Sequence, residues 1–554
     1  MSAITTVVPD IDLNLQHKDI LLQAPEDVTI RQWQSSNYST SSISFSCPPP
    51  SLSSFIDRYV VMATPVEISY GGTLSGGLSV LLQNGGDALR AFPIASITTS
   101  TQVTMNNQTF SMQTSEIVPY LAHYIKQNHR STFPNFLDKF SNYNDGVACN
   151  NNPLGTYGNA NGSEVMPRGA FPCVITNTAT TASITATIYE PLWLPPFHMQ
   201  PSDGLGFSNV RTMDVVVNLS SNLSRIVSHA INSNVSISNI SVAINQPILY
   251  MKYSTPKIGY VPRPLSYGSQ EIVRFPTAYT SSLSPNASAT IVSTNIQLNA
   301  IPSHVYLFVR DANANLTYTS TDTLCNISSV NFTFNNRSGL LSSASENTIF
   351  DMCRDNGLQD TWEDFHGVVS GGATSTVLST AVGTCGSVVK LAFGKDISLN
   401  SSEWVGKIGA FNLQINVVVT NRNQTVTLIT PTLYVVPVTP QKLIFHEDGN
   451  IESILGISQV SGDAPYIPFE SVKEFYGGSF KDFIGKVANF FKPVVDFLKS
   501  SKIISTVSGL IPHPIAQTIS QASSKLGFGE GEGEGEDGGR VMSRSQLHRR
   551  MRRV

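Results

Sequence analysis

An internal repeat constrains this sequence more than any other feature. The segment Val103–Thr109 has the same pattern as Phe332–Ser338, including an Asn-Asn pair, and a Ser-Glu pair follows each of them, ending at Glu116 and Glu346. Two further pairs of similar segments occur in the same order, namely 206–217 with 409–419 and 247–256 with 431–440. A repeat of this length predicts two complete domains of similar fold rather than a solenoid, with longer loops in the first copy.

The second copy indicates what each domain contains. Val305–Arg310 is an apolar run, and Val330, Phe332 and Phe334 share one face of an alternating segment, so both stretches predict β-strands. A turn is expected at Asn335–Gly339, because Asn and Gly tolerate positive φ. A short helix is predicted next, with Ser343 and Glu346 as a capping box, Ile349, Met352 and Cys353 on one face, and Gly357 at the C-terminal cap.

The composition is typical of an all-β protein with several domains. Only 13% of the 554 residues are charged, and helical patterns are confined to a few places. About eight strands per copy predict two tandem jelly-roll sandwiches, a double jelly roll, with a short helical and disordered C-terminal extension. The expected parts are an N-terminal arm (1–29), a first jelly roll (30–256), a second jelly roll (257–440), a C-terminal extension with an amphipathic helix (441–526), and an acidic Gly/Glu spacer with a basic tail (527–554).

Neither the cysteines nor the N-terminus indicates export. The six cysteines lie far apart, without CxxC or Cys/His metal-ligand spacing, so reduced and buried thiols are expected. Residues 1–19 have no basic region followed by an apolar core, which is what a signal peptide requires. We therefore expect a protein that is assembled inside the cell and is not secreted through a signal peptide.

Two segments of the first copy depart from the strand pattern. Residues 142–169 are dominated by Asn, Gly and Pro, which predicts a long exposed loop. Tyr189–Phe197 contains too many prolines for the interior of a sheet. We interpret it as a packed hydrophobic lid, and an aromatic platform for a ligand is the alternative.

Residues 480–499 have an amphipathic pattern. Apolar side chains recur on one stripe at helical spacing, four lysines mark the other side, and Pro493 predicts a kink. The segment is too charged to span a bilayer. We interpret it as a helix that docks on a partner surface, with an interfacial membrane helix as the alternative. The docking face is assigned to Phe483, Ile484, Val487, Phe490, Phe491, Val494 and Phe497.

The end of the chain carries charge in separate blocks. A flexible Gly/Glu spacer precedes Asp537, and the residues after it include six arginines and no acid. A basic tail of this kind neutralises phosphates without reading base sequence, so genomic DNA is a candidate partner. A solvated tail and a sorting signal are equally open interpretations. The residues concerned are Arg540, Arg544, Arg549, Arg550, Arg552 and Arg553.

No spacing in the sequence is persuasive for catalysis. The one formal Gly-x-Gly-x-x-Gly motif, Gly533–Gly538, lies in the acidic spacer, where carboxylates would repel a pyrophosphate. The carboxylates of Asp360–His366 are a candidate for acid–base or metal chemistry, but a hydrogen-bonded surface loop is the commoner explanation of such a cluster. We therefore predict no catalytic, cofactor-binding or metal-binding residues, no small-molecule substrate, and a protein that is not an enzyme.

Short motifs in both halves occur in an order known from one family. They are Leu194–Phe197, Gly204–Leu205, Asn209–Val210 and Asn222–Arg225 in the first half, and Ile301–Arg310, Thr321–Thr323, Asn326–Val330, Asn335–Leu341 and Asn356–Trp362 in the second. Together they resemble the major capsid proteins of the polinton-like virus, adintovirus and virophage lineage. The resemblance covers residues 30–440 and agrees with the internal repeat.

The resemblance implies a structural function in a virion. In that lineage three double jelly-roll subunits form a pseudo-hexagonal capsomer, and capsomers tile an icosahedral capsid around double-stranded DNA. The implied partners are two further copies in a homotrimer, neighbouring capsomers, and penton and minor capsid proteins. Genomic DNA or an inner membrane would be met through the C-terminal extension. Some relatives lose a C-terminal segment to a cysteine protease, but no cleavage motif is convincing here.

Two other functions fit parts of the sequence. A tandem β-sandwich adhesin or carbohydrate-binding surface protein would share the fold, but it predicts export and a monomer. A β-sandwich glycosidase requires paired carboxylates whose positions the sequence does not reveal. The missing signal peptide and the basic tail favour the major capsid protein.

Overall fold

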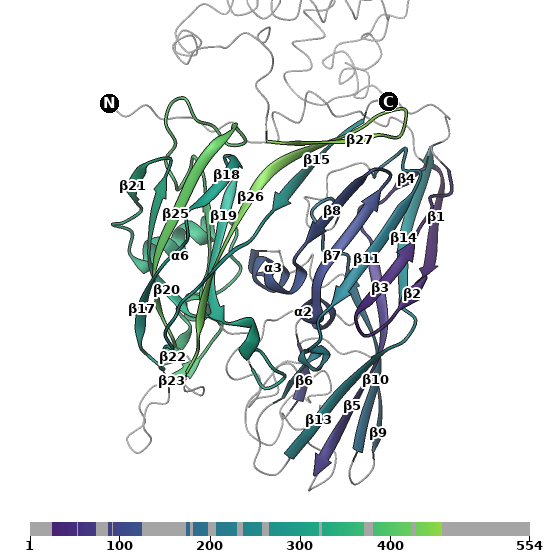
Figure 1. Ribbon diagram of the computed structural model, residues 1–554, viewed down its shortest axis with the longest axis horizontal. Helices are drawn as coiled ribbons and strands as arrows, with labels where there is room; N and C mark the ends of the chain where they lie inside the picture. The colour runs from purple at the N-terminus through teal and green to yellow at the C-terminus, as the bar shows by residue number, and fades with distance from the viewer. Residues whose placement is uncertain are drawn as a thin grey trace, which may run out of the picture. The chain divides into compact units, whose positions relative to one another are not determined.

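The computed structural model describes residues 25–456 with several interruptions, and Figure 1 shows their arrangement. Four of the expectations concern segments outside the described residues: the arm before Pro25, the loop at 142–169, the docking face in 480–499, and the spacer with its six arginines. The interruptions are 52–53, 74–86, 91, 125–172, 178–180, 198–205, 230–235, 257–264, 321–323, 371–380 and 423–427.

The first half of the chain contains two antiparallel sheets. In the described residues one sheet has the strand order β1-β14-β5-β10-β9, with β13 paired to β5 and β4 to β14, and the other has the order β2-β3-β11-β7-β8. The strands are β1 (Pro25–Gln34), β2 (Asn37–Tyr38), β3 (Ser42–Ser46), β4 (Phe55–Ile56), β5 (Val61–Thr73), β7 (Thr98–Met105), β8 (Gln108–Met112), β9 (Cys173–Asn177), β10 (Thr181–Pro191), β11 (Met213–Leu219), β13 (Ser236–Ile244) and β14 (Ile248–Pro256).

The second half repeats this arrangement. One sheet has the order β15-β26-β19-β24, with β16 and β27 also paired to β26, and the other has the order β17-β25-β20-β21, with β18 paired to β25. The strands are β15 (Leu265–Ile272), β16 (Phe275–Ala278), β17 (Ser288–Val292), β18 (Ile296–Ala300), β19 (His304–Asp311), β20 (Asn326–Phe334), β21 (Arg337–Leu340), β24 (Val388–Ala392), β25 (Ile408–Thr420), β26 (Pro431–Phe445) and β27 (Ile451–Leu455).

The similar segments of the sequence occupy equivalent strands. The order β3-β11-β7-β8 corresponds to β17-β25-β20-β21, and β1-β14-β5-β10 corresponds to β15-β26-β19-β24. The repeated segments fall on β7 and β20, on β11 and β25, and on β14 and β26. The expected all-β fold with two tandem jelly-roll sandwiches is therefore confirmed.

Short helices and two small strand pairs complete the described residues. Strand β6 pairs with β12, and β22 pairs with β23. Two helices follow equivalent hairpins, since α3 comes after β8 and α6 after β21. The elements are α2 (Pro93–Ile97), α3 (Thr114–Leu121), η3 (Ala122–Tyr124), η4 (Leu223–Ile226), η5 (Asn313–Asn315), α6 (Glu346–Asp355), α7 (Trp362–His366), β6 (Asp87–Leu89), β12 (Val227–His229), β22 (Val368–Ser370) and β23 (Ala381–Gly383).

The hairpin between β20 and β21 forms as its Asn-Asn sequence predicts. Asn335 and Asn336 have φ of 47° and 63°, in the left-handed region that asparagine tolerates. Asn106 in the equivalent turn of the first half has φ of 51°. The side chains of Val330, Phe332 and Phe334 are fully buried on one face of β20, as their alternation predicts.

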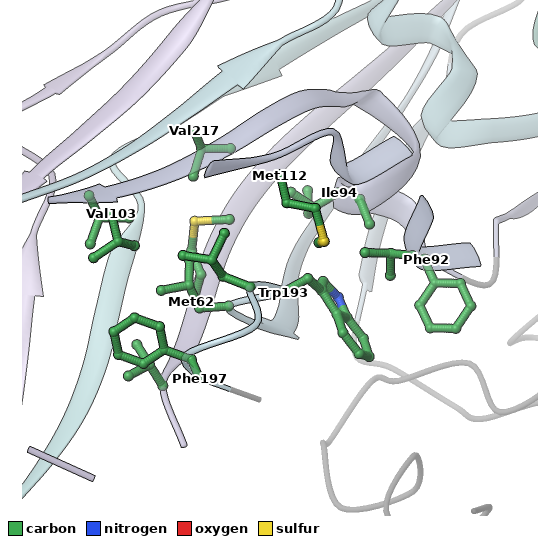
Figure 2. Packing of buried hydrophobic residues seen from close by; sticks show 14 of the residues in the cluster. Met62, Phe92, Ile94, Val103, Met112, Trp193, Phe197 and Val217 are labelled. Atoms are coloured by element: carbon green, nitrogen blue, oxygen red, sulfur yellow. The ribbon is translucent and has the colours of Figure 1, made fainter. Parts of the chain in front are cut away.

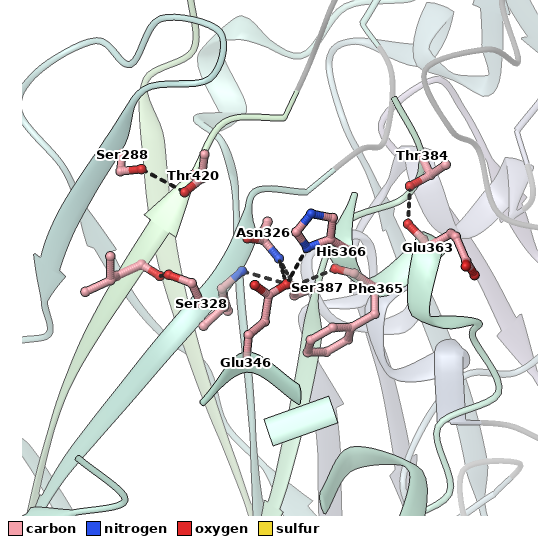
Figure 3. A network of polar contacts seen from close by, with 12 residues as sticks. Ser288, Asn326, Ser328, Glu346, Glu363, Phe365, His366, Thr384, Ser387 and Thr420 are labelled. Atoms are coloured by element: carbon pink, nitrogen blue, oxygen red, sulfur yellow. Dashed lines mark hydrogen bonds and ion pairs between the residues drawn. The ribbon is translucent and has the colours of Figure 1, made fainter. Parts of the chain in front are cut away.

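The predicted capping box of α6 is wrong in detail. The N-cap is Ser345 rather than Ser343, and its hydroxyl accepts the backbone N–H of Thr348. The carboxylate of Glu346 does not reach back to the N-cap, because it accepts hydrogen bonds from Asn326 at 2.8 Å and pairs with His366 at 2.6 Å (Figure 3). Ile349 and Cys353 face the core as expected, and Gly357 follows the helix with φ of 98°.

Strand residues extend past both ends of the expected jelly rolls. Strand β1 begins at Pro25, within the stretch expected to be an arm, and pairs with β14 along its whole length. Strand β26 continues past Pro440 to Phe445, and β27 returns antiparallel to it. These edge strands gain ladder hydrogen bonds from neighbours far away in sequence, which local patterns do not reveal.

The core of the first sandwich is built mainly from apolar side chains that point between its two sheets. Figure 2 shows Met62, Val103, Met112 and Val217 among them. The proline-rich segment after β10 closes this core, since Leu192, Trp193, Leu194 and Phe197 are each at most 3% exposed. Its interpretation as a packed hydrophobic lid is confirmed.

The central strands of one sheet of the second sandwich are buried on both faces. In β19, Val305, Leu307 and Val309 point into the core of the second sandwich, whereas Tyr306 and Phe308 belong to the core that continues into the first. In β26 every residue from Pro431 to Thr439 is buried. Because both faces of β19, β24 and this part of β26 are covered, these central strands read as continuous apolar runs, whereas β16 at the edge keeps an alternating pattern.

Candidate functional site: the junction between the sandwiches

The junction begins where α3 and η3 of the first sandwich meet β19, β24 and β26 of the second. The ring of Tyr120 stacks on Phe308 with centroids 4.2 Å apart, and Phe308 stacks on Tyr434 at 5.1 Å. All three rings are buried. Offset aromatic stacks add about 0.5–1.5 kcal/mol per pair beyond their area, so this column is a strong apolar contact between the two halves.

A buried cation lies beside the aromatic column. The Arg310 guanidinium is 4.8 Å from the Tyr434 centroid and 5.4 Å from that of Tyr120. It donates to the Tyr434 hydroxyl at 3.1 Å and to the Asn313 side chain at 2.6 Å. Asn313 in turn donates to the carboxylate of Glu116, which also pairs with Arg274. Glu116 of α3 thus ties the first sandwich to two residues of the second.

A second buried arginine donates to backbone carbonyls of both halves. Arg90 is 1% exposed, and its Nε donates to the carbonyl of Arg225 at 2.6 Å in its own half. Its Nη2 donates to the carbonyls of Thr317 at 3.0 Å and Ser320 at 2.7 Å in the second half. Asn222 adds a bond from Nδ2 to the Leu316 carbonyl at 3.0 Å. The planar, multi-donor guanidinium suits this set of convergent carbonyls.

The turn between β26 and β27 makes a third set of contacts with the first half. The Nδ2 of Asn107 donates to Asn450 Oδ1 at 2.6 Å, and its Oδ1 accepts the backbone N–H of Ile451 at 2.9 Å. Asn106 donates to the Gly449 carbonyl at 2.7 Å. The repeated Asn-Asn pair of the first half therefore serves both as a β-turn and as an attachment point for the second sandwich.

The carboxylate cluster at 360–366 belongs to this junction. Asp360 Oδ2 lies 2.5 Å from Nδ1 of His123 in η3, and both side chains are buried. Asp364 accepts from the Thr361 hydroxyl at 3.0 Å, and burial raises its pKa. The third member, His366, is the partner of Glu346 already described. Asp360, Asp364 and His366 each have a structural hydrogen bond and Glu363 is exposed, which fits the commoner of the two explanations considered for this cluster.

Four cysteines lie in the described part of the chain with their side chains placed, and all are buried and outside disulfides. Burial raises the pKa of Cys47 and Cys325 to about 12 and that of Cys353 to about 11. Since the thiolate is the reactive form, these thiols are inert packing groups at neutral pH. The expectation of reduced, buried thiols is confirmed for these residues, the fourth of which is Cys385.

Two searches of the described residues concern metals and membranes. No group of three or more His, Cys, Asp or Glu side chains within 25–456, outside the gaps, is arranged to hold a metal ion. Among the same residues no helix has the length and apolarity needed to cross a bilayer. The docking face around Phe490 and the tail arginines fall outside this region, so the structure brings none of those predicted site residues together.

The junction residues were not identified by sequence reasoning. The one local signal was the apolar run Val305–Arg310, which contains no outward polar positions and therefore indicates burial on both faces. Arg90 has no such signal, because the backbone carbonyls to which it donates can belong to residues of any type. Glu116 was recognised as part of the internal repeat, but its second-half partner Asn313 lies about 200 residues away.

Comparison with known proteins agrees with this architecture. The double jelly roll is a fold of viral capsid proteins: the crystal structure of the mavirus major capsid protein matches with a TM-score of 0.64 and 16% identity over 83% of this chain and 97% of that one. The 3.5 Å cryo-EM structure of the Sputnik virophage matches with a TM-score of 0.71 and 31% identity over 86% of this chain and 98% of that chain.

The sequence comparisons define the family. A family model for the first domain of the Sputnik virophage major capsid protein matches residues 6–258, and one for the C-terminal domain of major capsid protein V20 matches residues 273–440. The capsid protein V20 of Sputnik virophage is 34% identical over the whole of this chain and 99% of its own length. The chain belongs to the virophage major capsid protein family. This membership does not favour the adhesin alternative.

Proposed function

We propose that this chain is a purely structural protein that builds the virion shell as a homotrimer with a pseudo-hexagonal outline. The observation that supports this most directly is the duplicated sandwich joined by a buried junction. A closed three-fold ring of such chains presents six similar corners, so near-hexagonal packing needs only three subunits. The proposed contacts are with two copies in the trimer, with neighbouring capsomers, and with penton and minor capsid proteins.

We also propose that different parts of the chain have different functions. The two jelly rolls extend from β1 to β14 and from β15 to β27, residues 1–24 are an arm that lies across a neighbour, and residues 457–554 face the interior. Residues 1–537 carry a net negative charge, whereas the tail from Arg540 to Val554 has six arginines and no acid. This separation favours contact of the tail with DNA or another anionic surface.

The capsomer proposal is tested by the solution mass and negative-stain outline of the purified full-length chain. We expect trimers with a pseudo-hexagonal outline, because stable subunit contacts in obligate assemblies usually bury more than about 2,000 Å². A monomer that persists at high protein concentration would contradict the proposal and would revive the adhesin.

The tail is tested separately by replacing its six arginines with glutamine. Binding of the wild-type protein to random-sequence DNA should weaken as salt rises, with a slope that reflects up to about six phosphate contacts. The variant should lose that dependence, whereas replacing exposed Lys252 and Lys395 with glutamine should leave it unchanged. If the tail variant binds DNA as the wild type does, the arginines have another function.

The segment 480–499 is tested with vesicles and with the capsomer itself. Replacing Phe490 and Phe491 with serine removes apolar area from the docking face. If the segment docks on a protein surface, the variant should lose a partner from assembled particles but bind vesicles no less than the wild type. Loss of binding to anionic vesicles would instead support the interfacial membrane helix.

A further inference from the structure

The end of α6 and the strand β24 bring two lysines, an asparagine and an aspartate together. Asn356 is the C-cap of α6, and its Nδ2 donates to the backbone carbonyl of Lys390 at 3.0 Å. The same Nδ2 donates to Asp396 Oδ2 at 2.6 Å, and Asn356 Oδ1 accepts from Lys395 Nζ at 3.1 Å. The side-chain amide is therefore held at both of its polar atoms.

The amine of Lys390 lies next to this amide in an aromatic setting. Its Nζ is 3.2 Å from the backbone carbonyl oxygen of Asn356 and is 5.3 and 5.4 Å from the ring centroids of Tyr124 and Tyr306. Within the described residues Lys390 has no carboxylate partner in an ion pair. Burial, reinforced by the charge of Lys395, lowers the pKa of Lys390 to about 8 despite an opposing effect of Cys353. A fraction of the amine is therefore neutral near neutral pH.

The groups around the Asn356 amide are those that amide chemistry requires. An ammonium on the carbonyl oxygen stabilises negative charge that develops there, as Lys395 Nζ is placed to do. A carboxylate beside the amide nitrogen can carry a proton from an attacking amine to the departing one, as Asp396 is placed to do. The backbone carbonyl that accepts from Lys390 Nζ and the side-chain amide belong to the same residue, and the attack requires the terminal lysine torsions to turn Nζ from the backbone oxygen toward Cγ.

We propose that Lys390 and Asn356 join in an intramolecular isopeptide bond. Neutral Nζ of Lys390 attacks Cγ of Asn356, and the Cγ–Nδ2 bond breaks after the new N–C bond has formed. Asp396 takes one proton from Nζ and delivers it to Nδ2, which leaves as ammonia. No oxidant, metal or other reactant is consumed. The bond ties the end of α6 to β24, close to the Tyr124 contact of the junction, and it does not depend on the capsomer proposal.

A competing reaction of the same asparagine must be distinguished. Gly357 follows Asn356, and attack by its backbone nitrogen on Cγ would form a succinimide that also loses ammonia. In the structure the Gly357 N–H donates to the Arg354 carbonyl at 2.9 Å, which directs the nitrogen away from this attack. A succinimide hydrolyses to aspartate or isoaspartate, and it links no second peptide.

Mass spectrometry of the full-length protein tests the proposal. After incubation at about pH 8, near the pKa of Lys390, the denatured wild-type chain should be lighter by one ammonia, and a protease digest should contain a peptide that joins Asn356 to Lys390. The variants Lys390→Arg and Asp396→Asn should keep the full mass, and Lys395→Met should react more slowly. An unchanged wild-type mass, or ammonia loss without the joined peptide, overturns the proposal.

Lys407 provides a matched control. Its Nζ also donates to a backbone carbonyl, that of Ser402 at 2.7 Å, and lies 4.9 Å from the Trp404 ring centroid. No asparagine amide held by a carboxylate accompanies it among the contacts of the described chain. The variant Lys407→Arg should therefore lose ammonia to the same extent as the wild type, and a reduced extent would contradict the assignment to Lys390.

Discussion

Strands β14 and β26 occupy the same place in their sandwiches but have different surroundings. In β14 the buried residues Leu249, Met251 and Tyr253 alternate with more exposed ones such as Lys252. In β26 both faces are buried from Pro431 to Thr439, because its outer face packs against the first sandwich. The comparison teaches that the duplicated topology sets the backbone, whereas the packing of one copy on the other sets the side-chain pattern.

The equivalent helices α3 and α6 also differ in what they pack against. Helix α6 has a serine N-cap and packs Ile349 and Cys353 into the core of its own sandwich. Helix α3 has no side-chain cap and contains Pro119, and its Tyr120 stacks on a residue of the other sandwich. One copy of the helix closes a sandwich, and the other joins two.

The largest expected loss of stability concerns strand β19, which is buried on both faces. Phe308→Ala should lower the free energy of unfolding by about 3–5 kcal/mol, because it leaves a cavity between Tyr120 and Tyr434. Chemical denaturation of the full-length protein measures this change. The control Val292→Ala, at a position that is 48% exposed in β17, should change it by less than about 0.5 kcal/mol. Equal effects of the two variants would contradict the two-sided burial of β19.

A pH-dependent effect of roughly 3 kcal/mol is expected in the first sandwich. Glu190 at the end of β10 is buried, and burial raises its pKa from 4.5 to about 7 despite the N–H groups of Ile94 and Ala95. Since the folded-state pKa is raised, the folded state binds the proton more tightly. The contribution of Glu190 to stability should therefore be largest below pH 4.5 and should be lost as pH rises through about 7.

The pH effect is measured as the difference in Tm between acidic and mildly alkaline buffer, and Glu190→Gln should reduce that difference. Glu452, an exposed carboxylate in β27, supplies the control Glu452→Gln, which should leave the difference unchanged. If Glu190→Gln instead lowers Tm more in alkaline than in acidic buffer, the ionised carboxylate stabilises the fold, and this interpretation is refuted.

A smaller loss is expected for the buried guanidinium of the junction. Arg90→Met keeps much of the side-chain volume but leaves carbonyls of Thr317 and Ser320 without their donor, which should cost about 2 kcal/mol. Arg31→Met, at an exposed position of β1, is the control and should be nearly neutral. Urea denaturation compares the two, and a neutral Arg90→Met would show that the halves do not need this contact.

The smallest effect distinguishes the two helices. Ser345→Ala removes the N-cap of α6 and should destabilise the protein by about 1 kcal/mol. Gln113→Ala at the corresponding position of α3 removes no side-chain cap and should cost less than about 0.5 kcal/mol. Equal losses in urea denaturation would show that the two helix starts are not as different as their hydrogen bonds indicate.

Sequence reasoning found the features that are local and missed those that are not. The turns at Asn106 and Asn335, the alternation of Val330, Phe332 and Phe334, and the order of the repeated strands follow from short-range patterns. Arg90 donates to backbone carbonyls, which have no residue signature, and the pairing of His123 with Asp360 spans 237 positions. Edge strands such as β27 were missed because a distant neighbour, rather than their own pattern, defines them.

Hydrogen exchange of the full-length protein during thermal unfolding tests the shared junction most directly. Peptides from β14 report on the first sandwich, and peptides from β26 report on the sheet buried on both faces. If the two sandwiches form one cooperative unit, both sets should lose protection in the same transition, and Phe308→Ala should shift them together. Loss of protection in β14 at a temperature at which β26 remains protected would contradict a junction that unites the two sandwiches.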